Sequence, residues 1–311
     1  MSTLASLKKK SSLDKLTKAL QDSGKKTFKN EEGFWQPSVD KAGNGFALIR
    51  FLDSPAVDGD DGMPWVQIFG HGFQGPGGWY IENSLTTLGM ADPVSEYNTK
   101  LWNTGSEANK KVARDQKRKL SYISNIYVIK DPANPENEGK TFLFKYGKKI
   151  FDKIRTKINP SEQEIAAAAL EGVVLKSVNV FNFWEGANFK LKIRNVENYR
   201  NYDASEFESQ TSALLDGDDK KIEALWKSLP SLQSFLDPKN FKSYDELQKK
   251  LNKVLGIDGA PAKSVSNKTA ETAKPSMDVE DNDPPFDVGT IASADSSDDA
   301  DMEYFNKLAN G

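Results

Sequence analysis

The sequence predicts an α+β fold that is rich in strands, with a basic arm before it and an acidic tail after it. Three observations predict this class: short β-branched and aromatic runs between residues 30 and 210, a few amphipathic helical patterns, and a segregation of charge along the 311 residues. Short strands bounded by Gly, Pro and Asp, with few helices between them, are typical of a small barrel or sandwich.

The first segment, residues 1–29, is a basic arm. It holds eight lysines against two acidic residues, a net charge of +6. Ser12 can cap a short helix, whose narrow apolar stripe consists of Leu13, Leu16 and Leu20. This stripe is too small for an independent core, so we expect the arm to dock against another surface.

The body of the chain, residues 30–257, contains the predicted strands, which are short hydrophobic runs at 45–52, 65–69, 121–130, 141–146 and 188–196. The turn-rich stretch between the third and fourth runs predicts a hairpin with a long loop. The last run alternates cleanly, so that Phe189, Leu191 and Ile193 face one side of the sheet and basic residues face the other.

Amphipathic helices are predicted at three places in the body: 147–158, 218–236 and 243–256. The first of them places Ile150, Ile154 and Ile158 on one face, and Pro160 ends it. The chain around these helices is basic, since residues 100–157 carry fifteen Lys and Arg against six Asp and Glu, a net charge of +9.

From about residue 258 the composition changes to Ala, Ser, Lys, Pro and Asp, which indicates a disordered tail over 258–311. Residues 275–311 contain ten acidic residues against Lys307, a net charge of −9. The tail ends in DDADMEYFNKLAN, where apolar side chains embedded in acid are typical of a peptide that folds on a partner protein.

Composition excludes several classes of function. The chain has no cysteine, so it has no disulfide framework and no thiolate site. The one histidine, His71, therefore cannot belong to a two-histidine or Cys–His metal site. EGKT at 138–141 lacks the earlier glycine of a phosphate loop, and DGDDG at 58–62 lacks the spacing of a calcium loop. With no signal-peptide core and no run of 18 apolar residues, we expect a soluble protein without catalytic residues or cofactor.

Aromatic residues are interleaved with the basic ones. The interleaved set is Trp102, Arg118, Tyr122, Phe144, Lys145, Tyr146, Tyr199 and Tyr202. A flexible single strand of nucleic acid needs aromatic plates and a cationic groove, because stacking stabilises each base by about 1–3 kcal/mol and the phosphates supply a salt-dependent remainder. The same pattern also fits a solvated lysine-rich surface over ordinary core aromatics, and residue pattern leaves both interpretations open.

Several stretches in order between about residue 5 and residue 255 carry a resemblance: GNGFALIRFL, HGF…GGWYIE, KRKLSYISNIYVIKDPANPENEGK, FKYGKKIFDKI, WEGANFKLKIRNV and NYRNYD. Together they resemble the single-stranded-DNA-binding (helix-destabilising) proteins of T-even-type bacteriophages. The resemblance implies a five-stranded OB-fold barrel with a small associated subdomain and peripheral helices.

The resemblance also implies a function. The protein would coat single-stranded DNA cooperatively and without sequence preference during viral DNA replication, recombination and repair, in the cytoplasm of the infected bacterial host. The acidic tail would recruit replication and recombination proteins, namely a polymerase, a helicase loader and a recombinase mediator.

Matched position by position, the resemblance places base stacking and phosphate contacts in a cleft. The residues that would contact nucleic acid are Trp102, Lys117, Arg118, Lys119, Tyr122, Phe144, Lys145, Tyr146, Lys192, Tyr199 and Tyr202. Three departures stand out. Ile123 follows Tyr122 where the family often has tryptophan, the stretch 105–116 is longer and lacks a tyrosine, and Phe144 stands where tyrosine is usual.

Two similar basic clusters have different expected roles. KRKLS at 117–121 should meet phosphate in the cleft, and KKKSS in the arm should dock on the neighbouring molecule along the strand. The self-association residues would then be Lys8, Lys9, Lys10, Ser11 and Ser12. The acidic tail could occupy the cleft or the arm site until DNA displaces it.

The family generally carries a structural zinc held by one histidine and three cysteines. Here His71 matches the histidine, but the cysteine positions are Ser84, Asp92 and Ser95, which cannot supply four zinc ligands. We therefore expect no metal and a segment held by packing. The candidates for that packing are Trp79, Tyr80, Ile81, Leu85, Leu88, Met90 and Val94.

Two other functions stay open at this point. An RNA-binding translational repressor could use the same groove, because only the 2′-hydroxyl would discriminate the two nucleic acids. A carboxylate–metal nuclease is the enzymatic alternative, although no pair of carboxylates stands out in the sequence.

Overall fold

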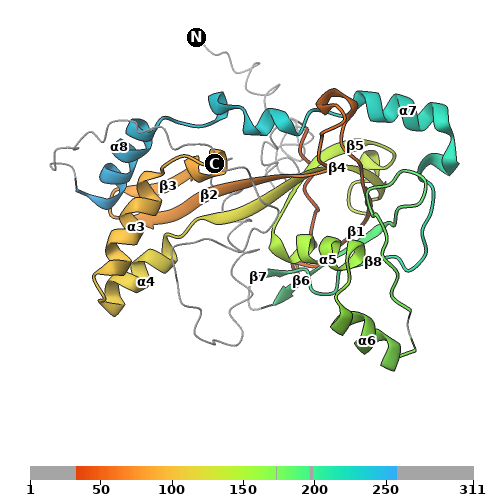
Figure 1. The fold of residues 1–311 in the computed structure, drawn as a ribbon, viewed down its shortest axis with the longest axis horizontal. Coiled ribbons are helices and arrows are strands. Elements are labelled where there is room, and N and C mark those ends of the chain that lie inside the picture. The colour runs from red at the N-terminus through yellow and green to blue at the C-terminus, as the bar shows by residue number, and fades with distance from the viewer. Residues whose placement is uncertain (1–32, 173, 197–198, 258–311) are drawn as a thin grey trace, which may run out of the picture.

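A computed structural model describes residues 33–172, 174–196 and 199–257 (Figure 1). The predicted basic arm with its KKKSS cluster and the predicted tail lie outside the described residues. The described part is a mixed α+β fold built on an antiparallel sheet, in agreement with the predicted class. None of its helices combines the length and apolar character that crossing a bilayer requires.

The sheet contains eight strands among the described residues: β1 Gly45–Phe51, β2 Val66–Gly75, β3 Gly78–Asn83, β4 Lys119–Lys130, β5 Thr141–Tyr146, β6 Phe189–Val196, β7 Tyr199–Asn201 and β8 Glu206–Phe207. Their order is β3-β2-β4-β1-β6-β7, with β5 paired to β4 and β8 paired to β6. The predicted hairpin is confirmed, since β4 pairs antiparallel with β5 after the long turn.

Strand β4 is shared by the two halves of the fold. Along one edge, its first half pairs with β2 (Val66 opposite Ile123) and its second half pairs with β1 (Phe51 opposite Ile126). Its other edge pairs with β5. Figure 1 accordingly shows β2 and β4 as long ribbons that run from an end with α3, α4 and α8 toward an end with α5.

Helices lie at both ends of this sheet: α3 Pro93–Asn103, α4 Glu107–Asp115, α5 Lys148–Ile158, α6 Glu162–Leu170, α7 Asp219–Ser228 and α8 Tyr244–Leu255. Short 3₁₀ helices occur at Ala56–Asp58, Leu85–Leu88, Pro135–Asn137, Leu214–Gly217, Gln233–Leu236 and Pro238–Asn240. The predictions of helices at 147–158 and 243–256 are confirmed within a residue or two. Ser243 begins α8 with a capping box to Glu246, which explains that boundary.

The prediction of one helix over 218–236 is wrong. Helix α7 ends at Ser228, and Leu229 is extended, with φ −66° and ψ 135°. The cause is Pro230, because a residue before proline is sterically disfavoured in the helical region. A separate 3₁₀ helix, Gln233–Leu236, follows and places Leu232 and Phe235 over the sheet beside Val66 and Ile68.

The main hydrophobic cluster lies between β1, β4, β5, β6 and α5. The predicted alternation in β6 is confirmed, since Phe189, Leu191 and Ile193 are at most 2% exposed. Phe51 lies at the centre of this cluster and contacts five aromatic rings, those of Phe144, Tyr146, Phe181, Phe189 and Phe207. On the side of β1 and β6 that faces away from this cluster, Phe46, Arg194 and Val196 are exposed, whereas Arg50 is buried.

A second cluster lies where α3 and α8 cover β2 and β3. It consists of Phe73, Tyr80, Leu85, Val94, Leu247, Leu251 and Val254. The end of α8 approaches the β2–β3 turn so closely that a Cβ on Gly77 would lie 1.9 Å from the carbonyl oxygen of Lys253. The Gly77 N–H donates to the carbonyl of Val254 at 2.8 Å, so the turn and α8 are joined directly.

Candidate nucleic-acid interface

The internal basic cluster lies at the start of β4, directly after α4. Lys117 is exposed, and Lys119 is half-buried opposite Gly70 of β2. The Arg118 guanidinium lies over the ring of Phe69, 4.1 Å from its centroid. This distance is well within the range of a cation–π contact, so the ring positions a permanent cation at this edge of the sheet.

Trp102 lies at the end of α3 and faces α4. Two cations from α4 contact its ring, with Lys110 Nζ at 5.6 Å and Arg114 Cζ at 5.3 Å from the centroid. Lys110 also forms an ion pair with Glu107 at 2.9 Å. The α3–α4 pair therefore presents a half-buried indole surrounded by positive charge, which suits contact with a base and its phosphate.

Three predicted stacking residues are core residues in this structure. Tyr122, Phe144 and Tyr146 are 4%, 3% and 2% exposed. Tyr122 stacks on Phe151 of α5 at 3.8 Å, and the hydroxyl of Tyr146 lies 2.8 Å from that of Ser124. Burial raises the pKa of Tyr146 well above its ordinary value. Contact with a base would require these rings to leave the core, so their stacking role stays a prediction.

Of the four remaining predicted residues, Lys192 and Tyr199 lie in the β6–β7 hairpin, Tyr202 follows β7, and Lys145 lies in β5. Tyr199 is 49% exposed, and Tyr202 is half-buried against the main cluster. Lys192 pairs with Glu206 at 2.7 Å, and this hydrogen bond lowers the pKa of the glutamate. Lys145 is half-buried on β5 opposite Ile123.

Strand alternation separates the predicted residues into groups. Tyr122 of β4 faces the main cluster, whereas Lys119 of β4 and Lys145 of β5 share the opposite face of the sheet with Ile123. Arg118 directly precedes β4. Lys192 faces away from the main cluster, because its neighbours in β6 are buried in that cluster. The structure thus brings Lys192 and Tyr199 onto one outer face of the β6–β7 hairpin.

The exposed ring of Phe46 was not among the predicted contact residues. Phe46 in β1 is 45% exposed and lies directly opposite Lys192 of β6. The period-two pattern of β1 contains the signal, since Ala47, Ile49 and Phe51 are buried and Phe46 must then point outward.

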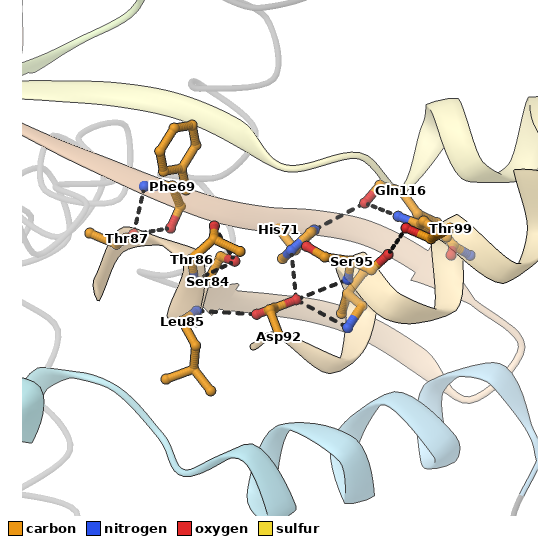
Figure 2. Close-up of polar contacts among 12 residues, drawn as sticks. Phe69, His71, Ser84, Leu85, Thr86, Thr87, Asp92, Ser95, Thr99 and Gln116 are labelled. Atoms are coloured by element: carbon orange, nitrogen blue, oxygen red, sulfur yellow. Dashed lines mark hydrogen bonds and ion pairs between the residues drawn. The ribbon is translucent and has the colours of Figure 1, made fainter. Parts of the chain in front are cut away.

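The positions that match a zinc site are instead occupied by a buried polar network (Figure 2). The His71 side chain lies between two acceptors, the Gln116 carbonyl 3.0 Å from Nδ1 and the Asp92 carboxylate 3.2 Å from Nε2. Asp92 caps α3 by accepting from the N–H groups of Val94 and Ser95, both at 3.0 Å, and its second oxygen accepts from Leu85 at 3.1 Å.

The pKa of Asp92 follows from these contacts. Burial by itself would raise this pKa, but the contact with the His71 ring and its charge, together with the N–H of Ser95, lower it to about 2. The carboxylate is therefore held in its charged form, as expected for an anion at the positive start of a helix.

The residues present do not fit a structural zinc. Such a site needs four ligands, and the only strong donors here, His71 and Asp92, are already used against each other. The Ser84 hydroxyl accepts from the Thr86 N–H as a local cap. Among the residues described, no three His, Cys, Asp or Glu side chains gather where they could hold a metal ion.

The packing predicted for this segment is confirmed in part. Tyr80, Leu85 and Val94 are at most 3% exposed and belong to the second cluster. The prediction for Met90 is wrong, since its side chain is 54% exposed. It follows Gly89, which ends the 3₁₀ helix in the left-handed region and turns the chain outward. Trp79, Ile81 and Leu88 are half-buried.

Comparison with known proteins gives consistent matches. Residues 43–255 match the model of the family described as gp32 DNA binding protein like. The chain is 38% identical over 274 residues to the single-stranded DNA-binding protein of Enterobacteria phage T4, covering 86% of this chain and 85% of that protein. It is 39% identical over 250 residues to the protein of the same name from Enterobacteria phage T2, covering 78% and 77%.

Proposed function

The chain belongs to the gp32 DNA binding protein like family, and from this premise we propose that it binds single-stranded DNA cooperatively and without sequence preference. It would coat and protect the strand during viral DNA replication, recombination and repair, in the cytoplasm of the infected bacterial host. It is a binding protein and not an enzyme, since its relatives are named for DNA binding and for no reaction.

The observation that carries this proposal is the pairing of cations with aromatic rings at one end of the sheet. Trp102 is contacted by Lys110 and Arg114, and Phe69 is covered by Arg118. Rings can stack on bases of any sequence, and the adjacent cations can neutralise phosphates. This combination suits a single strand, because duplex DNA hides the faces of its bases.

We also infer an OB-type barrel around the main cluster. The sharing of β4 between β1, β2 and β5 supports it, because a strand that changes partners along its length is a way to curve a sheet toward closure. The resemblance assigns the residues before this core (1–29) to self-association along DNA, and those after it (258–311) to the recruitment of replication and recombination proteins.

Affinity measurements test the central proposal. Fluorescence titration with an oligothymidylate, the matching oligouridylate and a duplex of equal length, all at one salt concentration, should give the tightest binding to single-stranded DNA. Equal or tighter binding to RNA would favour a translational repressor using the same groove. Release of nucleotides from labelled single-stranded DNA with Mg²⁺ would contradict the non-enzymatic assignment.

Deletions test the ends of the chain. Removing residues 1–20 should reduce cooperativity on long polynucleotides with a much smaller effect on an oligomer that holds one protein. Removing residues 275–311 should leave DNA binding unchanged or tighter, since a competing charge of −9 is lost, and should abolish capture of partner proteins. Unchanged cooperativity without the arm would contradict its docking role.

A further inference from the structure

The outer face of β1, β6 and β7 carries a strip of exposed side chains that no assigned role explains as a unit. In cross-strand register, Phe46 lies opposite Lys192, and Val196 lies opposite Tyr199. Lys192, Arg194 and Val196 are two residues apart along β6, so all three point to the same side. We call these five residues, Phe46, Lys192, Arg194, Val196 and Tyr199, the outer strip.

The outer strip combines exposed apolar side chains with basic ones. Phe46, Val196 and Tyr199 are 45%, 49% and 49% exposed, while Leu191 and Ile193 on the core side of β6 are almost fully buried and Asn195, nearer the β6–β7 turn, is exposed. Single exposed apolar residues are normal on protein surfaces. Here an aromatic ring stands at each end of one continuous face, and basic side chains lie between the rings.

The two basic side chains of the outer strip differ in whether an acidic residue neutralises them. Lys192 is held by Glu206 at 2.7 Å, and the neighbouring Lys190 lies 3.5 Å from Glu208. Arg194 is exposed, and no ion pair with another described residue engages it. Its cross-strand partner on β7 is the neutral Asn201. A permanent cation is therefore presented in the middle of the strip.

We propose that the outer strip is an additional contact surface for single-stranded nucleic acid, with Phe46 as a base-stacking residue and Arg194 as a phosphate contact. This inference rests on the proposed function and extends the bound strand from Tyr199 across β6 to β1. The occupant follows from charge complementarity and from continuity, since Lys192 and Tyr199 already belong to the candidate interface. From Lys192 to Val196 the strip spans about 14 Å along the strand, room for more than one stacked base.

Replacing Phe46 by alanine tests the stacking role. Its ring is half exposed and lies outside the main cluster, so the fold should be unaffected, as a thermal melt would verify. Affinity for a long oligothymidylate should fall roughly 5- to 150-fold, the range of losing one stacked base. The matched control is Val57→Ala, which removes an exposed apolar side chain (68% exposed) in a 3₁₀ helix away from the strip and should change nothing.

Two further variants complete the test. Phe46→Trp keeps an aromatic plate, should restore affinity, and should add a tryptophan whose fluorescence is quenched by DNA. Arg194→Ala should lower the slope of log affinity against log salt by about 0.7. If the wild type binds DNA, Phe46→Ala binds it with the same affinity, and Phe46→Trp shows no added quenching, the inference about the outer strip is wrong while the proposed function stands. Failure of the wild type to bind would overturn the proposed function as well.

Discussion

Replacing Asp92 by alanine would show how much its hydrogen-bonded carboxylate stabilises the segment around α3, which has no metal site among the described residues. The change removes the cap of α3, which costs about 1 kcal/mol, and leaves the Leu85 N–H without its buried acceptor, which costs about 1–3 kcal/mol. It also leaves the His71 ring without its buried partner, a loss of about 3–5 kcal/mol when measured alone. These losses overlap, so we expect a total near 3–5 kcal/mol.

The matched control is Asp92→Asn. It keeps one oxygen that can accept from Val94 and Ser95 but removes the charge that faces His71. We expect it to lose roughly 1–2 kcal/mol, less than alanine, because the cap is retained. A larger loss in Asn than in Ala would contradict this ranking.

Urea unfolding followed by tryptophan fluorescence measures the free energy in each variant, with and without EDTA. The wild-type transition should be indifferent to the chelator. The role given to Asp92 would be refuted if the unfolding free energy of Asp92→Ala lay within about 0.5 kcal/mol of the wild-type value, which is the scatter of ordinary surface substitutions. One equivalent of zinc by elemental analysis, with destabilisation by EDTA, would refute the metal-free interpretation.

Acid should weaken the same network. The pKa of Asp92 is depressed to about 2 in the folded protein, below its ordinary value near 3.9. Its contribution to stability is therefore fully present above about pH 4 and is lost as the pH falls through the folded pKa. The wild type should lose about 2 kcal/mol more than Asp92→Asn between pH 5 and pH 2.

Three other substitutions give separate tests. Tyr122→Ala should destabilise the fold by about 3–5 kcal/mol, because the ring is buried and stacked on α5, and a near-wild-type urea midpoint would contradict its core position. Arg118→Ala should lower the salt slope of DNA binding by about 0.7, with a stability loss of about 0.5–1 kcal/mol from the cation–π contact with Phe69. Glu206→Gln should tighten DNA binding at low salt by freeing Lys192, whereas Glu223→Gln, at a comparable exposed pair on α7, should not; equal effects in titration would exclude a local cause.

Much of the fold could be predicted because local pattern and burial agree. The β4–β5 hairpin and the alternation of β6 follow from period-two sequences with one face in the core. Helices α3 and α4 were not predicted, because neither has a wide apolar stripe: their buried residues are few, and Asn98 is among those of α3. Tertiary contacts with α8 and with His71 stabilise them instead.

The site could be predicted less well than the fold, because exposure is a tertiary property. Tyr122 follows the basic cluster closely and looks available in the sequence, yet β4 is covered on both faces, by α5 on one and by Leu232 on the other. Phe46 looks like a core residue in the apolar run GFALIRFL, and its outward position follows once Ala47, Ile49 and Phe51 are known to be the buried residues. The role of Asp92 could not be predicted from the sequence, because this residue both caps α3 and contacts His71, and only the folded chain brings these groups together.

The contact between α8 and the β2–β3 turn has a consequence for the order in which the protein is made. Phe73 and Tyr80 reach their final surroundings only when Leu247, Leu251 and Val254 arrive, some 170 residues later in synthesis. Before α8 has been synthesised, the chain therefore lacks the residues that cover Phe73 and Tyr80, whose rings stack 5.1 Å apart in the folded protein. Non-local closure of this kind slows folding and leaves apolar surface open to aggregation. Chains truncated before residue 255 should accordingly be recovered as insoluble or chaperone-bound material, whereas chains truncated just after α8 should not.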